Sequence, residues 1–133
     1  MDGWDDVQLD WMRHLVRLNV DRVEEPKFLN AHDVKRLKSE IETQRTVLER
    51  IAEDKPLDGL LILMARYMRK YADLHIEWYG RRLDDRTFRA EVLAAKKRLR
   101  EELRNAKAQQ GGSATEGLEA VAEEATAAPD ASG

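Results

Sequence analysis

The sequence predicts an all-α protein: a small antiparallel bundle of about four helices, the fourth long and basic, followed by a disordered acidic tail. Three observations predict this class. Charged residues make up 37% of the chain, above the ~25% usual for globular domains, and such a composition is typical of helices. Only seven glycines and three prolines are present to mark turns. Apolar residues recur at intervals of three and four, the period of a helix with one buried face.

The first helix is predicted over about residues 5–23. Asp5 or Asp6 can cap it, because a short carboxylate accepts the free backbone N–H groups of a first turn. Pro26 ends the helix by biasing Glu25 away from the helical region. The predicted apolar stripe consists of Trp4, Val7, Trp11, Leu15 and Leu18, widened by Met12 and Val16.

The second helix is predicted over about residues 33–53, with Asn30 and Asp33 as candidate caps. Its apolar stripe is narrow, and Gln44 interrupts it at the midpoint. The stripe consists of Val34, Leu37, Ile41, Leu48 and Ile51. A stripe of this width resembles a coiled-coil seam more than a broad core face.

A clear turn at residues 54–59 precedes the third helix, which is predicted over about residues 58–79. This helix is the most apolar of the four, and its apolar positions are Leu60, Leu61, Ile62, Leu63, Met64, Tyr67, Met68, Tyr71, Leu74 and Trp78. Such breadth predicts a central helix that contacts more than one neighbour. Gly80 is expected to close it as a left-handed cap, because glycine adopts that conformation without steric cost.

The fourth helix is predicted from Asp84 or Asp85, either of which can cap it, to about Ala108. A heptad-like apolar stripe runs along it, formed by Phe88, Val92, Ala95, Leu99, Leu103 and Ala106. The neighbouring face carries Arg89, Lys96, Arg100 and Lys107. The sequence leaves open whether this helix packs on the other three or projects from them.

Charge divides the chain into three regions. Residues 1–80, the predicted compact core, carry 13 bases and 16 acids, a net charge of -3. Residues 81–110, the basic amphipathic helix, carry ten bases and five acids, a net charge of +5. Residues 111–133 carry five acids and no base, and have too little apolar mass to offset chain entropy, which predicts disorder. This asymmetry concerns partners and self-association.

Several function classes are disfavoured by the residues. The chain lacks cysteine, which excludes disulfides, thiolate metal sites and a cysteine nucleophile. Neither a Glu-x-x-His pair, nor Ser-His-Asp logic, nor a glycine-rich phosphate loop occurs, and His14, His32 and His75 are expected at surface or boundary positions. The apolar run at residues 59–65 is far shorter than the ~20 residues of a membrane span. We therefore expect a cytoplasmic, non-enzymatic protein without metal, cofactor or small-molecule ligand.

Protein binding is the leading hypothesis. Trp4, Trp11, Trp78 and Tyr79 provide more aromatic surface than so small a body needs, and Trp and Tyr dominate interface hot spots. The alternative is that they belong to the core. A second set on the fourth helix could pair with its own copy or with another protein's helix; it consists of Phe88, Val92, Leu99 and Leu103.

Nucleic-acid binding is the runner-up. A basic helix can neutralise backbone phosphates without reading sequence. The candidate residues are Arg89, Lys96, Lys97, Arg100, Arg104 and Lys107. Against this, Glu91, Glu101 and Glu102 interleave with the bases, and no aromatic residue lies on the basic face for stacking. A solvated amphipathic helix remains the simpler interpretation.

Two stretches resemble a family of short, uncharacterised proteins of actinobacteria and their phages. Residues 31–45 open at His32-Asp33 and continue through an E-[VI]-E-x-x-R pattern, and the apolar run 60–67 is followed by Asp73 and a closing Glu77-Trp78. The resemblance covers about residues 5–79. It implies a phage or accessory gene and brings no activity, cofactor or partner with it.

Overall fold

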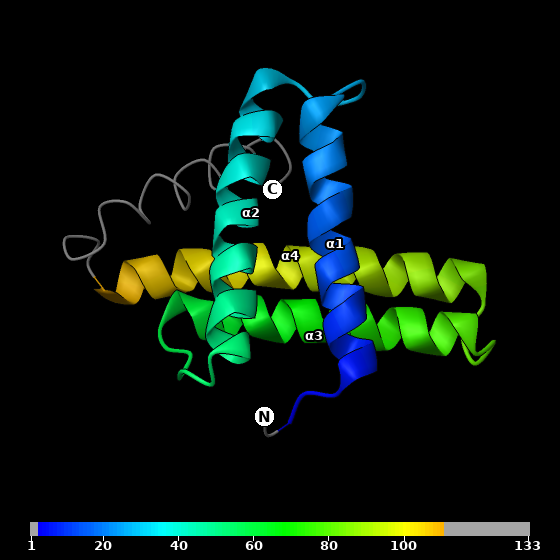
Figure 1. Ribbon diagram of the computed structural model, residues 1–133. Coiled ribbons are helices and arrows are strands. Elements are labelled where there is room, and N and C mark those ends of the chain that lie inside the picture. The colour runs from blue at the N-terminus through cyan, green and yellow to red at the C-terminus, as the bar shows by residue number, and fades with distance from the viewer. Residues whose placement is uncertain (1–2, 111–133) are drawn as a thin grey trace.

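The computed structural model describes residues 3–110, which form four helices and no strand (Figure 1). The helices are α1 (Asp6–Glu24), α2 (Ala31–Ala52), α3 (Leu60–Tyr79) and α4 (Asp85–Gln110). The all-α class and the four helices are therefore confirmed. The tail predicted to be disordered, residues 111–133, lies outside the described residues.

Three of the predicted helix caps are present. The Asp5 carboxylate accepts the backbone N–H of Gln8 at 2.8 Å, and the Gln8 side chain accepts the backbone N–H of Asp5 at 3.2 Å. This reciprocal pair is a capping box, which satisfies two of the free donors of the first turn. Asn30 accepts the backbone N–H of Asp33 at 2.8 Å, and Asp84 accepts the N–H three residues after it at 2.7 Å.

The prediction that Gly80 forms a left-handed cap is wrong. Gly80 has φ -78°, and Arg81, with φ +61°, takes the left-handed conformation instead. The backbone N–H of Arg82 then donates to the carbonyl of Glu77 at 2.8 Å, which completes a Schellman motif. A Cβ at position 80 would lie 3.2 Å from the carbonyl oxygen of Ile76, so crowding accounts for the glycine there.

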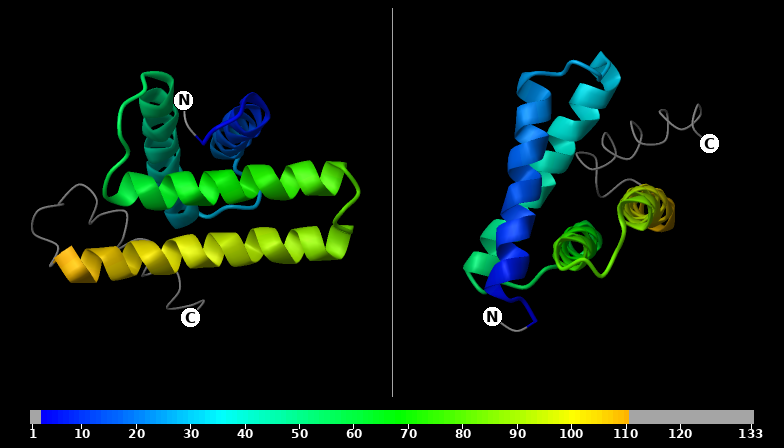
Figure 2. Two further views of the ribbon diagram at one scale, coloured as in Figure 1. Left: turned by 90° about the horizontal axis from the view of Figure 1, so that it is seen from below. Right: turned by 90° about the vertical axis from the view of Figure 1, so that its right-hand side faces the viewer.

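The four helices form two antiparallel hairpins, α1 with α2 and α3 with α4, that cross each other steeply (Figure 1). Figure 2 shows α3 and α4 end-on in the view where α1 and α2 are seen lengthwise. Helix α3 lies between the first hairpin and α4 and contacts all three other helices. The predicted central position of the third helix is confirmed.

The core lies where the hairpins cross. Its most deeply buried side chains are Met12, Gln44, Val47, Met64 and Met68. Helix α4 contributes Leu99 and Leu103, which are 4% and 6% exposed. The fourth helix therefore docks on α3, and residues 85–110 belong to the same compact unit as the first three helices.

The predicted stripe of α1 is partly wrong. Val7 and Leu18 are 55% and 40% exposed, whereas Leu9, which the stripe omitted, is buried. The physical reason is the crossing of the hairpins. Helix α1 is covered by α2 along one side and by α3 only where α1 and α3 cross. A different face of α1 is therefore buried from the one that would be buried in a bundle of parallel helices.

Candidate binding sites

Seven rings from three helices gather near the turn between α3 and α4, and we call this cluster the aromatic end. Its members are Trp11 and His14 of α1, Tyr71, His75, Trp78 and Tyr79 of α3, and Phe88 of α4. His75 lies at its centre, 4.6 Å from the ring of Trp11 and 4.8 Å from that of Phe88. Trp78 and Phe88 stack at 4.4 Å with their planes 11° apart.

Polar contacts hold these rings in fixed positions. The indole N–H of Trp78 donates to Asp85 at 2.7 Å, which ties the end of α3 to the start of α4. The Nδ1 atom of His75 lies 3.0 Å from the carbonyl oxygen of Tyr71. Fixed aromatic side chains lose little entropy when a partner binds, which favours their use as an interface.

The aromatic end is partly exposed to solvent and lies beside positively charged side chains. Tyr79 is 67% exposed, and Trp11, Trp78 and Phe88 are half-buried. An open hollow beside Trp78 and Tyr79 is also lined by Arg81, Arg82 and Arg86. These three arginines are exposed and form no ion pair within residues 3–110. The end thus offers aromatic surface beside positive charge.

Burial acts on the titratable groups of the aromatic end. It lowers the pKa of His75 below its usual 6.5, since the charged imidazole is poorly solvated there, although the contact with the Tyr71 carbonyl acts in the opposite direction and nearby His14 adds to the lowering. Burial also raises the pKa of Tyr71 to about 12. The imidazole and the phenol are therefore neutral near pH 7.

The other residues predicted for protein binding lie outside the aromatic end. Trp4 lies away from the aromatic end, with the guanidinium of Arg69 over its ring at 4.1 Å. Val92 is half-buried on α4. Leu99 and Leu103 lie in the core, so in this conformation they cannot form a pairing seam with a second copy.

The six residues predicted for nucleic-acid binding do not share one open face. Arg89 and Lys97 are exposed, whereas Lys96, Arg100, Arg104 and Lys107 are half-buried. Lys96 and Arg100 line a cleft toward α1 and α2. A continuous basic face that could follow a phosphate backbone is therefore not formed.

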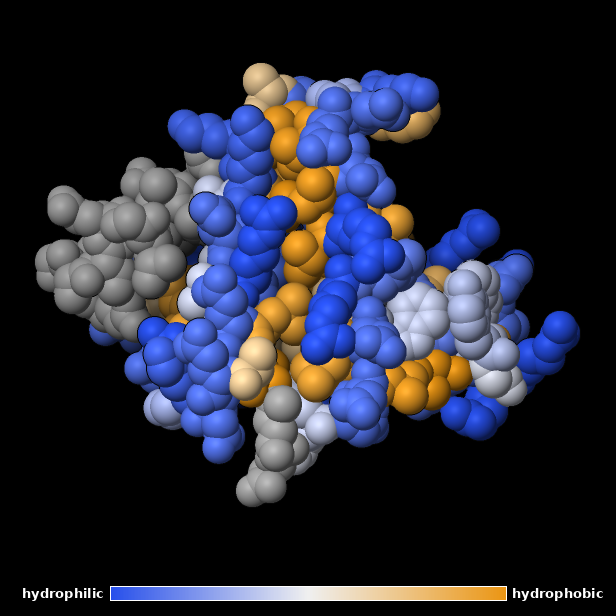
Figure 3. Space-filling model, viewed as in Figure 1, coloured by the Kyte–Doolittle hydropathy of each residue, from blue (hydrophilic) through white to orange (hydrophobic). Residues whose placement is uncertain are grey.

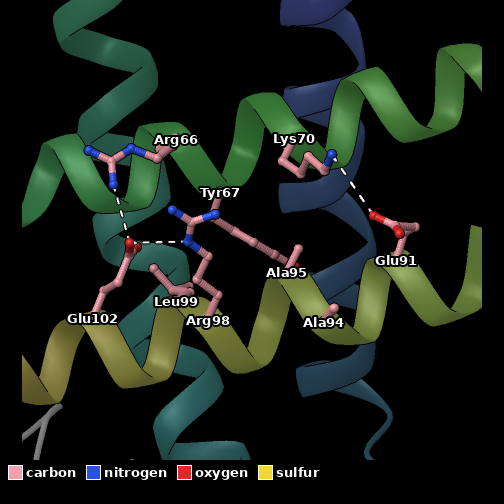
Figure 4. A pocket seen from close by; sticks show the side chains of 9 residues that line it. All are labelled: Arg66, Tyr67, Lys70, Glu91, Ala94, Ala95, Arg98, Leu99 and Glu102. Carbon is pink, nitrogen blue, oxygen red and sulfur yellow. Dashed lines mark hydrogen bonds and ion pairs between the residues drawn. The ribbon is translucent and has the colours of Figure 1, made fainter.

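On the face away from the first hairpin, α3 and α4 border a groove of about 270 Å³ (Figure 4). Two ion pairs cross it, Arg66 with Glu102 at 3.2 Å and Lys70 with Glu91 at 4.0 Å, and Glu102 also contacts Arg98 of its own helix at 3.3 Å. The remaining lining residues are Tyr67, Ala94, Ala95 and Leu99. Exposed ion pairs of this kind contribute little stability.

The opposite face of the molecule shows an apolar seam between α1 and α2, with hydrophilic side chains on both sides (Figure 3). A shallow part of it is lined by Val20, Val23 and Ile41, with Lys38 and Arg45 among the polar neighbours. Ile41 is buried and the two valines are half-buried, so the seam is largely closed by the helices themselves.

Sequence reasoning missed a second site, which we call the charged cleft. Side chains of all four helices line it, together with Leu29 from the connection between α1 and α2; they are Asn19, Arg22, Asp33, Arg36, Leu37, Glu40, Tyr67, Lys96, Leu99 and Arg100. Glu40 is only 8% exposed and forms no hydrogen bond or ion pair within residues 3–110. One signal was available: Glu40 stands three and four residues from Leu37 and Gln44, on the buried face of the second helix.

Burial governs the charges of this cleft. It raises the pKa of Glu40 above its usual 4.5, although Arg100, Arg36, Lys96 and Arg22 act in the opposite direction. Burial also lowers the pKa of Lys96, and the positive charges of Arg22 and Arg100 add to that effect while Glu40 opposes it. Both groups therefore carry an electrostatic cost that no direct contact relieves.

Together these features define an all-α protein of two crossed helical hairpins. No family model matches the chain, and neither a curated protein nor a solved structure matches it significantly. The resemblance of residues 5–79 to a family of actinobacterial and phage proteins stays a prediction. Among the described helices, none combines the length and apolar content needed to cross a membrane, and residues 3–110 contain no cluster of His, Asp and Glu side chains suited to a metal ion.

Proposed function

We propose that this protein is a non-enzymatic binding protein, which uses the aromatic end to capture an acidic segment of a partner protein. One observation carries the proposal: Trp11 of α1, Trp78 and Tyr79 of α3 and Phe88 of α4 come together at one end of the molecule. Rings with polar tips and arginines are the residue types that dominate interface hot spots.

Charge supports an acidic partner segment. Arg81, Arg82 and Arg86 line the hollow beside the rings without an ion pair in the described chain. The two nearby acids are already engaged, because Asp84 caps α4 and Asp85 accepts from Trp78. Both acids keep their negative charge and line the same hollow, so its three arginines leave a net positive charge of one for an incoming carboxylate. Arginine binds carboxylates with two parallel hydrogen bonds.

The placement of the basic residues of α4 supports binding to a protein over binding to nucleic acid. A phosphate backbone needs several exposed cations in a row, whereas Lys96 and Arg100 turn toward the charged cleft. Light scattering at low and high salt, on protein purified without nuclease, separates the two. A particle that carries nucleic acid and dissociates in high salt would contradict a protein-binding role for residues 81–110.

Selection from a random peptide library on the immobilised full chain tests the proposal. We expect enrichment of peptides with Asp or Glu beside an apolar residue. Tyr79→Ala should weaken the selected peptides by about 2 kcal/mol, as for a hot-spot residue. The double variant Arg82→Ala with Arg86→Ala should weaken them further and remove most of their salt dependence.

The matched control is Lys38→Ala with Arg45→Ala, which removes the same charge from the exposed side of α2. This control should bind the selected peptides as the native chain does. The proposal fails if no acidic peptides are enriched, or if the control weakens them as much as the arginine variant. If the retained sequences match residues 111–133, the partner is a second copy of this chain, whose last 23 residues carry five acids and no base.

A further inference from the structure

The charged cleft collects more cations than its acids can neutralise. Arg36 is paired with Asp33 at 3.2 Å, which accounts for two of its six charged groups. The other four are Arg22, Lys96 and Arg100 against the single carboxyl of Glu40. None of these four forms a hydrogen bond or ion pair within residues 3–110.

Space is present between these groups. The cleft has a volume of about 50 Å³. A polar cavity needs at least about 10–15 Å³ of such volume to hold one water, so this space suits a few waters or one compact polyatomic ion. Its walls come from both hairpins: Asn19 and Arg22 on one side, Lys96 and Arg100 on the other. The groups are thus held around a gap by the packing of four helices.

We propose that the charged cleft binds a small tetrahedral oxyanion, with inorganic phosphate as its ligand, between Arg22, Lys96 and Arg100. Guanidinium and ammonium groups are the side chains that bind phosphate, and two arginines on opposite walls can each present a pair of N–H donors. Glu40 lies at the buried side of the cleft, close enough to Tyr67 for its charge to raise the pKa of that phenol, which burial raises most. This site is separate from the aromatic end and independent of the function proposed for it.

The electrostatics of the charged cleft favour an anion. Burial lowers the pKa of Lys96, and the positive charges of Arg22 and Arg100 lower it further, so both guanidinium groups repel the Lys96 ammonium. A bound anion replaces this repulsion by attraction. Burial raises the pKa of Glu40, so its carboxyl gains a proton more readily than an exposed one and then donates a hydrogen bond in place of repelling the ligand.

Calorimetric titration of the full chain with inorganic phosphate tests the site, with chloride added to keep ionic strength constant. The native chain should bind one phosphate in a saturable manner. Arg100→Gln should weaken binding by about tenfold or more, because it removes a charged donor. Lys97→Gln removes the same charge from the adjacent, exposed position of α4 and should leave the affinity unchanged.

Glu40→Gln should have the opposite effect to Arg100→Gln on phosphate binding, since it keeps the shape of the side chain and removes its negative charge. Phosphate should bind this variant more tightly than the native chain above pH 7. If Arg100→Gln does not fold, Arg22→Gln on exposed α1 surface takes its place. Absence of saturable binding to the native chain overturns the proposal. Equal weakening by Lys97→Gln overturns it as well, because it would show a general charge effect.

Discussion

The aromatic end and the charged cleft are built in the same way and differ in how their polar groups are satisfied. Each collects side chains from both hairpins. At the aromatic end Trp78 donates to Asp85, and the rings contact one another. In the charged cleft, Glu40 and Lys96 lie close to opposite charges without a direct contact. The difference teaches that rings can complete a site by packing alone, whereas buried charges need water or a ligand.

The strongest way to break this comparison is to detach α4 from α3, because both sites depend on α4. Leu99→Asp places a carboxylate in the core and should lower the free energy of unfolding by about 4 kcal/mol or more. Leu93, 66% exposed on the same helix, provides the control: Leu93→Asp should change it by less than about 0.5 kcal/mol. Urea unfolding followed by circular dichroism measures both. Equally small losses of stability in the two variants would contradict the docking of α4 on α3.

A smaller effect is expected from the buried carboxyl of the charged cleft. The folded chain holds the pKa of Glu40 above the usual 4.5, so it binds the proton more tightly than the unfolded chain. Its contribution to stability is therefore complete at low pH and declines as pH rises above 4.5. Without phosphate, Glu40→Gln should be more stable than the native chain at pH 7, by on the order of 1 kcal/mol, and this advantage should vanish near pH 4.

Urea unfolding across this pH range, in a buffer free of oxyanions, measures that advantage. Glu101→Gln, an exposed change on α4, should show no such trend. An advantage of Glu40→Gln that grows on acidification would have the wrong sign and would show that the carboxylate is stabilised by its cations.

At the aromatic end, the hydrogen bond between Trp78 and Asp85 should contribute about 0.5–1 kcal/mol, because it is exposed to water. A double-mutant cycle isolates it. Trp78→Phe keeps a ring against Phe88 and removes the donor, and Asp85→Ala removes the acceptor. The coupling between the two changes is read from their unfolding free energies. Additive effects would show that the rings are held by packing alone.

The smallest expected effect is that of His75 on the pH dependence of stability, and its sign is opposite to that of Glu40. The pKa of His75 is lowered, so the folded chain binds this proton less readily than the unfolded one. Its contribution to stability is lost as pH falls below 6.5, opposite to the direction expected for Glu40. Titration by NMR should place the midpoint of His75 below 6.5, and the midpoint should rise in Phe88→Ala, which exposes the ring. A midpoint above 6.5 would contradict this burial.

The sequence predicted the helices better than the way they pack. Asp5, Asn30 and Pro26 act locally, so the bounds of α1 and the Asn30 cap of α2 followed from them, although α2 begins at Ala31, before the predicted residue 33. The exposure of Val7 and the burial of Leu9 did not follow, because they depend on where α3 crosses α1. The left-handed conformation of Arg81 and the crowding around Gly80 were equally invisible in the sequence.

The candidate sites show the same limit. The ring types pointed to Trp4, Trp11, Trp78 and Tyr79, and the apolar stripe of the fourth helix to Phe88. The structure brings all of these together except Trp4, which lies against Arg69. Glu40 passed unnoticed, because a single acid on a stripe interrupted by Gln44 does not reveal which cations the other hairpin will place beside it. A site whose chemistry depends on two crossing layers can be recognised only when the crossing is known.

The pairing of neighbours into hairpins also bears on how the chain folds. Helices α3 and α4 are joined by a short turn at residues 80–84, and α1 and α2 by residues 25–30, so each pair can assemble from nearby segments. Proteins dominated by such local pairings fold within microseconds to milliseconds, about a thousandfold or more faster than those built from distant strands. The slower step is then the meeting of two finished hairpins, and Glu40 loses most of its exposure to water only at that step.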